Sequence, residues 1–257
     1  MLKLRTDLYE KYFGEPWVDS VSKYGHLLND PNLYKRVAYD AVIGTGEVTP
    51  DKVTQLYYHP AMQFRNANVL SDVFINSVQE QAADPELRNK SWMYRFATDQ
   101  GLDKDAAILD FGCGAGDLSL HLFFNGYKNV TLVNLGTPAF RMLKEFLATE
   151  YGVRCVVLDD LAPITFENYD YVICSEVMEH CFDPVNDLRS IVSSLKIGGI
   201  MYLSVFFNCL EGADPTHLHK NCIYQDTALW FEEVKKAGLE LIWKCPRGTE
   251  KGYRRVR

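Results

Sequence analysis

The sequence predicts an α/β protein with a mainly parallel sheet of seven strands, helices on both faces of that sheet, and a helical N-terminal region. From Ala106 onward, short β-type apolar runs alternate with helical stretches, a pattern typical of parallel sheets. The first hundred residues show amphipathic helical periodicity and little strand pattern. Apolar residues make up 47% of the 257 residues, which is enough to bury a sizeable core.

The N-terminal region is predicted to contain several short helices. Their ranges are 8–13, 21–28, 33–43 and 69–81. The breaks between them fall at Asp30-Pro31, at Gly44-Thr45-Gly46 and at Asp84-Pro85. Thr49 and Pro50 indicate a further helix start, with Thr49 as the N-cap and Pro50 in the first helical position.

The remaining chain supplies the sheet. The predicted strands are 107–110, 129–134, 154–158, 171–174, 200–207, 239–244 and 253–256, and the predicted helices are 117–125, 139–151, 184–195 and 227–237. In sheets of this type, ligands bind beyond the carboxyl ends of the strands.

Composition excludes several classes of partner. The net charge is −7 and the only basic cluster is the terminal Arg254-Arg255-Val256-Arg257, so we expect no nucleic-acid partner. The N-terminus lacks the apolar stretch of a signal peptide, and no run of about twenty apolar residues predicts a membrane span. The seven cysteines form no C-x-x-C pair, and we expect reduced thiols and a cytoplasmic location. The oligomeric state is left open by the sequence.

A glycine-rich loop joins the first predicted strand to a helix. Gly112, Gly114 and Gly116 alternate with other residues, which allows a tight turn and lets a ligand approach the backbone and the amides of the helix start. The spacing is G-x-G-x-G and differs from the G-x-G-x-x-G of nicotinamide-binding proteins. Asp110 precedes the loop, and its carboxylate suits a ligand with an ammonium group better than one with a pyrophosphate. An ordinary strand-to-helix turn is the alternative interpretation.

The segment 108–118 closely resembles motif I of the class I S-adenosylmethionine-dependent methyltransferases. Further segments resemble the later motifs of that family in order and spacing, at 129–136, 156–161, 169–180 and 195–201. Together they cover about residues 105–245. The resemblance implies a Rossmann-like S-adenosylmethionine-binding domain over 101–257, with residues 1–100 as a helical lid on the substrate side.

The resemblance also implies a set of cofactor-binding residues. They are Asp110, Gly112, Cys113, Gly114, Gly116, Asn134, Leu135, Asp159, Asp160, Leu161 and Ser175. The three glycines would line the methionine part of the cofactor, with Asp110 near its amino group. Asp159 would hydrogen-bond the adenine amino group, although a solvated loop is the other interpretation of Asp159-Asp160. Ser175 and Glu176 would close over the sulfonium region.

Asn134 departs from the family pattern, which usually has an acidic residue at the end of the second strand to accept hydrogen bonds from both ribose hydroxyls. An amide offers one acceptor oxygen and adds a donor. The favoured interpretation is a tolerated loss of one charged hydrogen bond, on the order of 1.5–3 kcal/mol at most. The alternative is a site for a cofactor with an extra negative charge, such as carboxy-S-adenosylmethionine.

Three histidines and one glutamate are candidate catalytic residues: His180, His217, His219 and Glu176. A base is needed only if the acceptor is a hydroxyl or a protonated amine, because positioning supplies most of the catalysis of methyl transfer. His217 and His219 with the nearby Asp214 form a weak metal-binding pattern, and we expect no metal.

In the N-terminal region, three neighbouring residues are candidate substrate contacts: Tyr57, Tyr58 and His59. Aromatic residues at this density more often belong to a core. Their place in the predicted lid favours a role in choosing the substrate.

The predicted function is methyl transfer from S-adenosyl-L-methionine to the oxygen or nitrogen of a small-molecule acceptor, with S-adenosyl-L-homocysteine as the product. A second hypothesis keeps the cofactor and changes the reaction to carboxymethyl transfer, aminocarboxypropyl transfer or cyclisation of the cofactor. A third is a non-catalytic S-adenosylmethionine-binding module.

Overall fold

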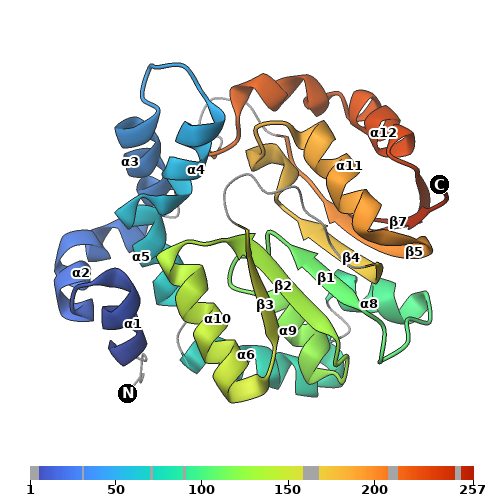
Figure 1. Cartoon of the computed structure of the whole chain (residues 1–257), viewed down its shortest axis with the longest axis horizontal. Helices are drawn as coiled ribbons and strands as arrows, with labels where there is room; N and C mark the ends of the chain where they lie inside the picture. Colours follow the sequence, from blue (N-terminus) through green and yellow to red (C-terminus); the bar gives the residue numbers. More distant parts are fainter. Residues whose placement is uncertain are drawn as a thin grey trace.

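The computed structural model of the chain contains one seven-stranded sheet, with the strand order β3-β2-β1-β4-β5-β7-β6 (Figure 1). The strands are β1 (Ile108–Phe111), β2 (Val130–Leu135), β3 (Arg154–Leu158), β4 (Tyr169–Ser175), β5 (Leu195–Ser204), β6 (Leu239–Lys244) and β7 (Lys251–Arg255). The structure describes residues 6–30, 32–69, 72–88, 91–158, 168–207, 214–246 and 250–257.

The sheet is mixed but mainly parallel. From β3 to β5 every neighbouring pair is parallel, whereas β7 runs antiparallel to both β5 and β6. The predicted α/β fold with seven strands is therefore confirmed, with β7 as the antiparallel strand. The strand order changes direction between β1 and β4, and in such sheets this switch point, at the carboxyl ends of the strands, is where ligands bind.

Helices cover both faces of the sheet because apolar side chains alternate along each strand. In β1, Ile108 packs in one core cluster with side chains from α9 (Asp117–Phe124) and α10 (Pro138–Tyr151). The next residue, Leu109, packs in a second cluster with side chains from α11 (Pro184–Ser194) and α12 (Thr227–Lys236). The two clusters occupy opposite faces of the sheet.

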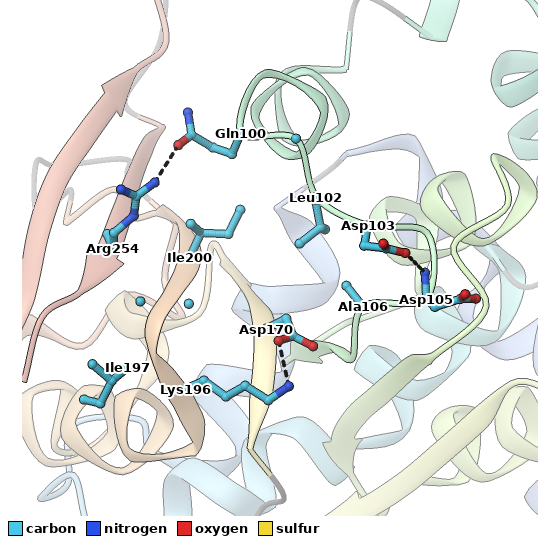
Figure 2. Close-up of a pocket in the computed structure, with 13 residues that line it drawn as sticks. Gln100, Leu102, Asp103, Asp105, Ala106, Asp170, Lys196, Ile197, Ile200 and Arg254 are labelled. Atoms are coloured by element: carbon cyan, nitrogen blue, oxygen red, sulfur yellow. Dashed lines mark hydrogen bonds and ion pairs between the residues drawn. The ribbon is translucent and has the colours of Figure 1, made fainter.

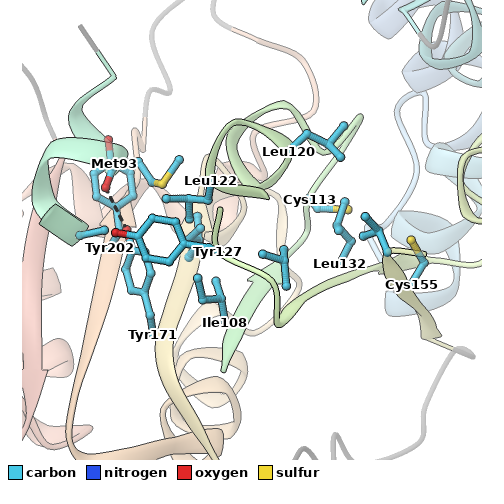
Figure 3. Close-up of a cluster of buried hydrophobic side chains, with 14 of the residues drawn as sticks. Met93, Ile108, Cys113, Leu120, Leu122, Tyr127, Leu132, Cys155, Tyr171 and Tyr202 are labelled. Atoms are coloured by element: carbon cyan, nitrogen blue, oxygen red, sulfur yellow. Dashed lines mark hydrogen bonds between the residues drawn. The ribbon is translucent and has the colours of Figure 1, made fainter. Parts of the chain in front are cut away.

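A helix from the N-terminal part of the chain completes the first of these clusters. Met93 of α8 (Trp92–Asp99) is buried with Tyr171 and Tyr202 of the central strands (Figure 3). Phe96 of the same helix is buried in this cluster. The Tyr171 hydroxyl donates a hydrogen bond to the backbone carbonyl of Met93 at 3.3 Å. This helix is therefore built into the core of the sheet, although it precedes residue 101.

The other N-terminal helices are short. They are α1 (Thr6–Phe13), α2 (Trp17–Tyr24), η1 (Gly25–Asn29), α3 (Leu33–Val42), α4 (Pro50–Tyr58), α5 (Pro60–Val69), α6 (Asp72–Ala83) and α7 (Pro85–Arg88). Helices α1 to α5 gather at one side of the sheet, beyond α10 (Figure 1). Lys11 forms an ion pair with Glu145 of α10, and Gln63 of α5 accepts a hydrogen bond from the Ala139 amide at 2.9 Å. These contacts fasten the helices to the sheet layer.

Most predicted helix starts are confirmed, and the misses have local causes. The Thr49 hydroxyl caps α4 and Pro50 is its first residue, as expected. The predicted helix 21–28 is interrupted at Gly25, where the chain tightens into η1. The strand predicted at 200–207 instead begins at Leu195, because Leu195 already pairs with Tyr169 before the irregular segment ahead of Ile200.

The expectation that all cysteines are reduced thiols is wrong for Cys222. Cys222 is disulfide-bonded, whereas Cys113, Cys155, Cys174, Cys181 and Cys245 are free. The absence of a C-x-x-C pair cannot reveal a bond between cysteines that are farther apart in sequence. None of the helices in the described part of the chain is long and apolar enough to cross a membrane.

Candidate functional site

The glycine loop lies at the carboxyl end of β1, at the switch point of the sheet. Gly114 has a φ of 55°, and a side chain added there would meet no atom within 4 Å. Gly112 and Gly116 also have positive φ, but a Cβ on them would come within 2.5 Å of Val177 and Leu132, respectively. Gly114 is therefore the glycine with open space for a ligand, while its neighbours permit close packing inside the protein.

Asp110 lies on β1 just before this loop and is buried. The hydroxyl of Ser119, on α9, donates a hydrogen bond to its carboxylate at 2.7 Å. Burial raises the pKa of Asp110 to about 7, although the Ser119 hydrogen bond opposes the rise. A carboxylate held in this way gains from a positively charged partner, such as the ammonium group of an amino-acid ligand.

The remaining residues of the predicted cofactor set are placed only in part. Asn134 and Leu135 end β2, and the Asn134 amide oxygen accepts a hydrogen bond from the Leu135 backbone N–H at 2.8 Å. Cys113 is buried within the glycine loop. Asp159, Asp160 and Leu161 lie outside the described residues.

Ser175 ends β4, and Glu176 follows it in a strained conformation. Glu176 has a φ of 55°, the only positive value among the non-glycine residues that the structure describes. Such strain costs on the order of 1–3 kcal/mol and clusters at functional sites. The Ser204 hydroxyl, at the end of β5, donates a hydrogen bond to the Glu176 carboxylate. The strained turn thus fixes this carboxylate between the carboxyl ends of β4 and β5.

A cluster of one carboxylate and two imidazoles lies beside this turn. Glu179 and His180 belong to η2 (Met178–His180), and His217 lies in the segment after β5. One ligand atom from each of the three side chains lies within 4.8 Å of the others. The His180 and His217 rings are 4.9 Å apart between centroids. The structure therefore brings together two of the predicted histidines, whereas the side chain of His219 is not described.

Hydrogen bonding fixes the tautomer of His180. Its Nδ1 lies 3.1 Å from both the backbone carbonyl and the hydroxyl oxygen of Thr216. The Thr216 hydroxyl donates its proton to Asp214 at 2.5 Å, and the carbonyl can only accept. Nδ1 must therefore donate, which leaves the Nε2 lone pair of His180 free to accept a proton or a ligand. Burial lowers the pKa of His180 to about 4, so the ring is neutral near pH 7.

Glu179 is the residue that sequence reasoning missed. It is fully buried, and its Oε1 accepts a hydrogen bond from the Phe206 amide at 3.2 Å. Its Oε2 is buried without a hydrogen-bond partner in the described part of the structure. Burial raises the pKa of Glu179 to about 8, and the nearby Glu176 carboxylate adds to the rise. The Glu-x-x-Glu-His spacing of 176–180 was the available signal, because it returns both acids and the histidine to one turn.

The N-terminal helices reach the same cluster. The Tyr57 ring of α4 lies edge-on to His180, with 6.3 Å between centroids. Its hydroxyl is buried beside Thr216 without a well-formed hydrogen bond to any described residue, and burial raises its pKa. Lys35 of α3 forms an ion pair with Asp214. Helices α3 and α4 therefore cover the segment that carries His217.

The other two predicted substrate residues are placed differently. The His59 Nδ1 accepts a hydrogen bond from the Ala61 amide at 3.2 Å, so this side chain caps the start of α5. Tyr58 is exposed. Of the three neighbours, Tyr57 is the one in contact with the cluster.

A pocket of about 620 Å³ lies at the opposite, amino end of the strands (Figure 2). It is lined by the segment that precedes β1, by the first residues of β4 and β5, and by Arg254 of β7. Asp170 forms an ion pair with Lys196 at 2.7 Å, and Arg254 donates a hydrogen bond to Gln100 at 3.2 Å. Neither the glycine loop nor the histidine cluster contributes to this pocket.

Known proteins that are similar to this chain in structure or in sequence include methyltransferases. The structure is similar to that of the mitomycin 7-O-methyltransferase MmcR, with a TM-score of 0.51 and 18% identity over 97% of this chain and 71% of that one. A relative from Xanthomonas axonopodis pv. citri, named ubiquinone biosynthesis O-methyltransferase, is 31% identical over 157 residues, which are 53% of this chain and 63% of the relative. A relative of the same name from Nitrosospira multiformis is 34% identical over 100 residues, 38% of this chain and 41% of the relative. The chain thus spans less than two thirds of the length of these relatives.

The strand order, the glycine loop and the antiparallel β7 define the fold of the class I S-adenosylmethionine-dependent methyltransferases. The sequence profile of the family described as "Methyltransferase domain" matches residues 80–247. The chain belongs to this family. The match begins within α6, so it includes the helix α8 that completes the core.

Proposed function

We propose that the protein transfers a methyl group from S-adenosylmethionine to a hydroxyl oxygen of a small molecule. The observation that carries the choice of a hydroxyl is the cluster of the buried Glu179 with the half-buried His180 and His217 at the carboxyl end of the sheet. A hydroxyl must lose its proton to become a good nucleophile, whereas a neutral amine needs no base. The names of the relatives, both O-methyltransferases, support the same choice.

On the cofactor side, the methionine part would lie against Gly114, where the backbone is open. The cofactor ammonium would pair with the buried Asp110 carboxylate, whose only described side-chain partner is the Ser119 hydroxyl. The adenosine would extend toward the end of β2, where Asn134 would accept one ribose hydrogen bond after a small rearrangement of its amide.

On the acceptor side, the sulfonium methyl would face the carboxyl ends of β4 and β5, between Glu176 and the histidine cluster. Helices α3 and α4 would act as the lid, since Tyr57 and Lys35 already contact this region. A covered site holds the acceptor in line with the methyl group, which is the main requirement of this reaction. Tyr57 would contact the acceptor.

The test is a product assay with methyl-labelled S-adenosylmethionine and two pools of metabolites, one of hydroxylated compounds and one of amines. The expected result is S-adenosylhomocysteine together with label in the hydroxylated pool. Methylthioadenosine as the by-product would instead support aminocarboxypropyl transfer or cyclisation. Binding of the cofactor without turnover in either pool would contradict an O-methyltransferase.

A further inference from the structure

The cluster of Glu179, His180 and His217 combines one carboxylate with two imidazoles, which are also ligands of metal ions. We propose that these three residues bind a divalent first-row transition ion, such as zinc, and that the ion holds the acceptor's hydroxyl oxygen in its open position. The second half of this proposal rests on the proposed function. The first half, ion binding, stands on the geometry alone.

The donor set favours such an ion. Two imidazoles and one carboxylate form the ligand set of many catalytic zinc sites, which keep a fourth position open for water or substrate. Imidazole ligands favour zinc, iron, cobalt or nickel over magnesium and calcium. Ligand atoms that share an ion at about 2.1 Å lie roughly 3–4 Å apart. The observed atoms lie within 4.8 Å of one another, so small side-chain rotations would bring them to one ion.

The carboxylate of Glu179 lacks what an ion would supply. Its Oε2 is buried with no hydrogen-bond partner among the described residues. A buried acid without a partner is costly. A bound cation would satisfy this oxygen.

His180 is oriented as a metal-binding histidine would be. Metal-binding imidazoles usually donate their other N–H to a carbonyl or a carboxylate, which fixes the ring. Here the His180 Nδ1 donates to the Thr216 carbonyl, and Thr216 is held by Asp214, which pairs with Lys35 of α3. The Nε2 lone pair of His180 is therefore directed by a chain of contacts that ends in the N-terminal helices.

Tyr57 is a second buried polar group beside the cluster. Its hydroxyl has no well-formed hydrogen bond among the described residues, and its ring lies against His180. A water or an acceptor oxygen bound to the ion would give this hydroxyl a partner. Tyr57 would thus act as a positioning residue for the oxygen in the open position.

The proposed transfer has two steps, which are loss of the acceptor's hydroxyl proton and attack of its oxygen on the methyl carbon. Coordination of the acceptor hydroxyl to the ion lowers its pKa, as it does for metal-bound water. The proton passes to the exposed Glu176 carboxylate and then to solvent. A lone pair of the oxygen attacks the methyl carbon, the carbon–sulfur bond breaks toward sulfur, and neutral S-adenosylhomocysteine leaves.

Ion binding can be tested without any acceptor. The purified chain is treated with a chelator and then titrated with Zn²⁺ and Mg²⁺ by calorimetry, and with Co²⁺ by visible absorption. We expect one Zn²⁺ or Co²⁺ per chain, with Mg²⁺ at least 100-fold weaker. Less than one ion per chain, or equal affinity for Mg²⁺ and Zn²⁺, would overturn the site.

Three variants locate the ion. Glu179→Gln and the half-buried His217→Ala should each weaken Co²⁺ binding at least 100-fold, while Asp170→Asn, an acid at the opposite end of the sheet, should leave it unchanged. S-adenosylhomocysteine affinity and the unfolding temperature show that each variant is folded. If Glu179→Gln fails to fold, His217→Ala still decides the question. Unchanged Co²⁺ binding in a folded His217→Ala variant would overturn the assignment.

Activity separates this proposal from the function on which it rests. Methyl transfer should fall at least tenfold in the chelated enzyme and return with Zn²⁺ or Co²⁺, and Tyr57→Phe should raise the acceptor KM more than it lowers kcat. Full transfer by the chelated enzyme would overturn the ion's role and leave the O-methyltransferase intact. Ion binding with no transfer to either pool would overturn the proposed function and leave the ion site standing.

Discussion

The two ends of the sheet differ in how their polar groups are satisfied. At the amino end, Asp170 pairs with Lys196, and Arg254 donates to Gln100 around the pocket in Figure 2. At the carboxyl end, Glu179 and Tyr57 bury polar atoms that lack hydrogen-bond partners among the described residues. Buried polar groups are normally paired, so the exceptions need a cause. Trp230 and Glu250 also bury an atom without a hydrogen-bond partner among the described residues. The atoms of Glu179 and Tyr57 indicate a ligand site because both side chains adjoin the histidine cluster.

The largest expected effect is at Gly114. Gly114→Val should weaken binding of S-adenosylhomocysteine at least 100-fold, because the side chain would fill the open space that the ligand needs. Gly126→Val is the matched control: Gly126 also has a positive φ and a Cβ added to it would meet no atom within 4 Å, so both variants carry similar backbone strain. Calorimetry should show normal affinity in the control. Equal affinity in both variants would remove the glycine loop from the site.

The buried carboxyl group of Asp110 should affect the free energy of unfolding. Burial raises its pKa to about 7, whereas an unfolded aspartate titrates near 4. Between these values Asp110 holds a proton only in the folded protein, so its contribution to the free energy of unfolding falls as pH rises from about 4 to about 7 and is constant above. Asp110→Asn should remove this contribution, leave the slope that comes from Glu179, and stabilise the ligand-free protein at pH 8, by up to roughly 4 kcal/mol.

The measurement is urea unfolding of wild type and Asp110→Asn at several pH values without cofactor. Saturating S-adenosylhomocysteine should stabilise the wild type more than the variant, because its ammonium gives the carboxylate a partner. An equal change of the free energy of unfolding between pH 5 and pH 7 in wild type and variant would show that Asp110 does not titrate as described.

A smaller effect is expected at Asn134. Asn134→Asp should keep or tighten S-adenosylmethionine affinity by up to about tenfold, since a carboxylate accepts hydrogen bonds from both ribose hydroxyls. If the site had evolved for carboxy-S-adenosylmethionine, the same change would selectively weaken that ligand by repulsion between like charges. Competition binding with both ligands distinguishes these cases. Equal changes for both would exclude Asn134 from ligand selection.

The smallest effect is expected at the amino end. Burial alone would raise the pKa of Asp170, but the hydrogen bonds from Lys196 and the Ala107 amide lower it below its ordinary value. The pair is partly exposed, so Asp170→Asn should cost only about 1 kcal/mol of stability at pH 7, and this difference should vanish as pH falls below about 4. Methyl transfer should be unchanged. A large loss of activity would show that the amino end of the sheet takes part in catalysis.

The sequence was sufficient for the sheet and for the place of the glycine loop in it. Strand and helix periods are local, so all seven strands were predicted, and the glycine loop follows from its spacing between β1 and α9. Glu179 was not singled out, because its burial and its free Oε2 depend on η2 folding under the segment after β5. The contact of Tyr57 with His180 joins segments far apart in sequence, which periodicity cannot detect. His59, by contrast, makes a local cap that resembled a substrate contact in the sequence.

The most direct test of the account is a crystal structure with S-adenosylhomocysteine bound. We predict that its methionine part lies against Gly114 with its ammonium at Asp110, and that its sulfur faces the cluster of Glu179, His180 and His217 at the carboxyl end of the sheet. Density for the ligand in the pocket between Asp170 and Arg254, or a sulfur directed away from the cluster, would contradict the central claim that the carboxyl end is the catalytic end.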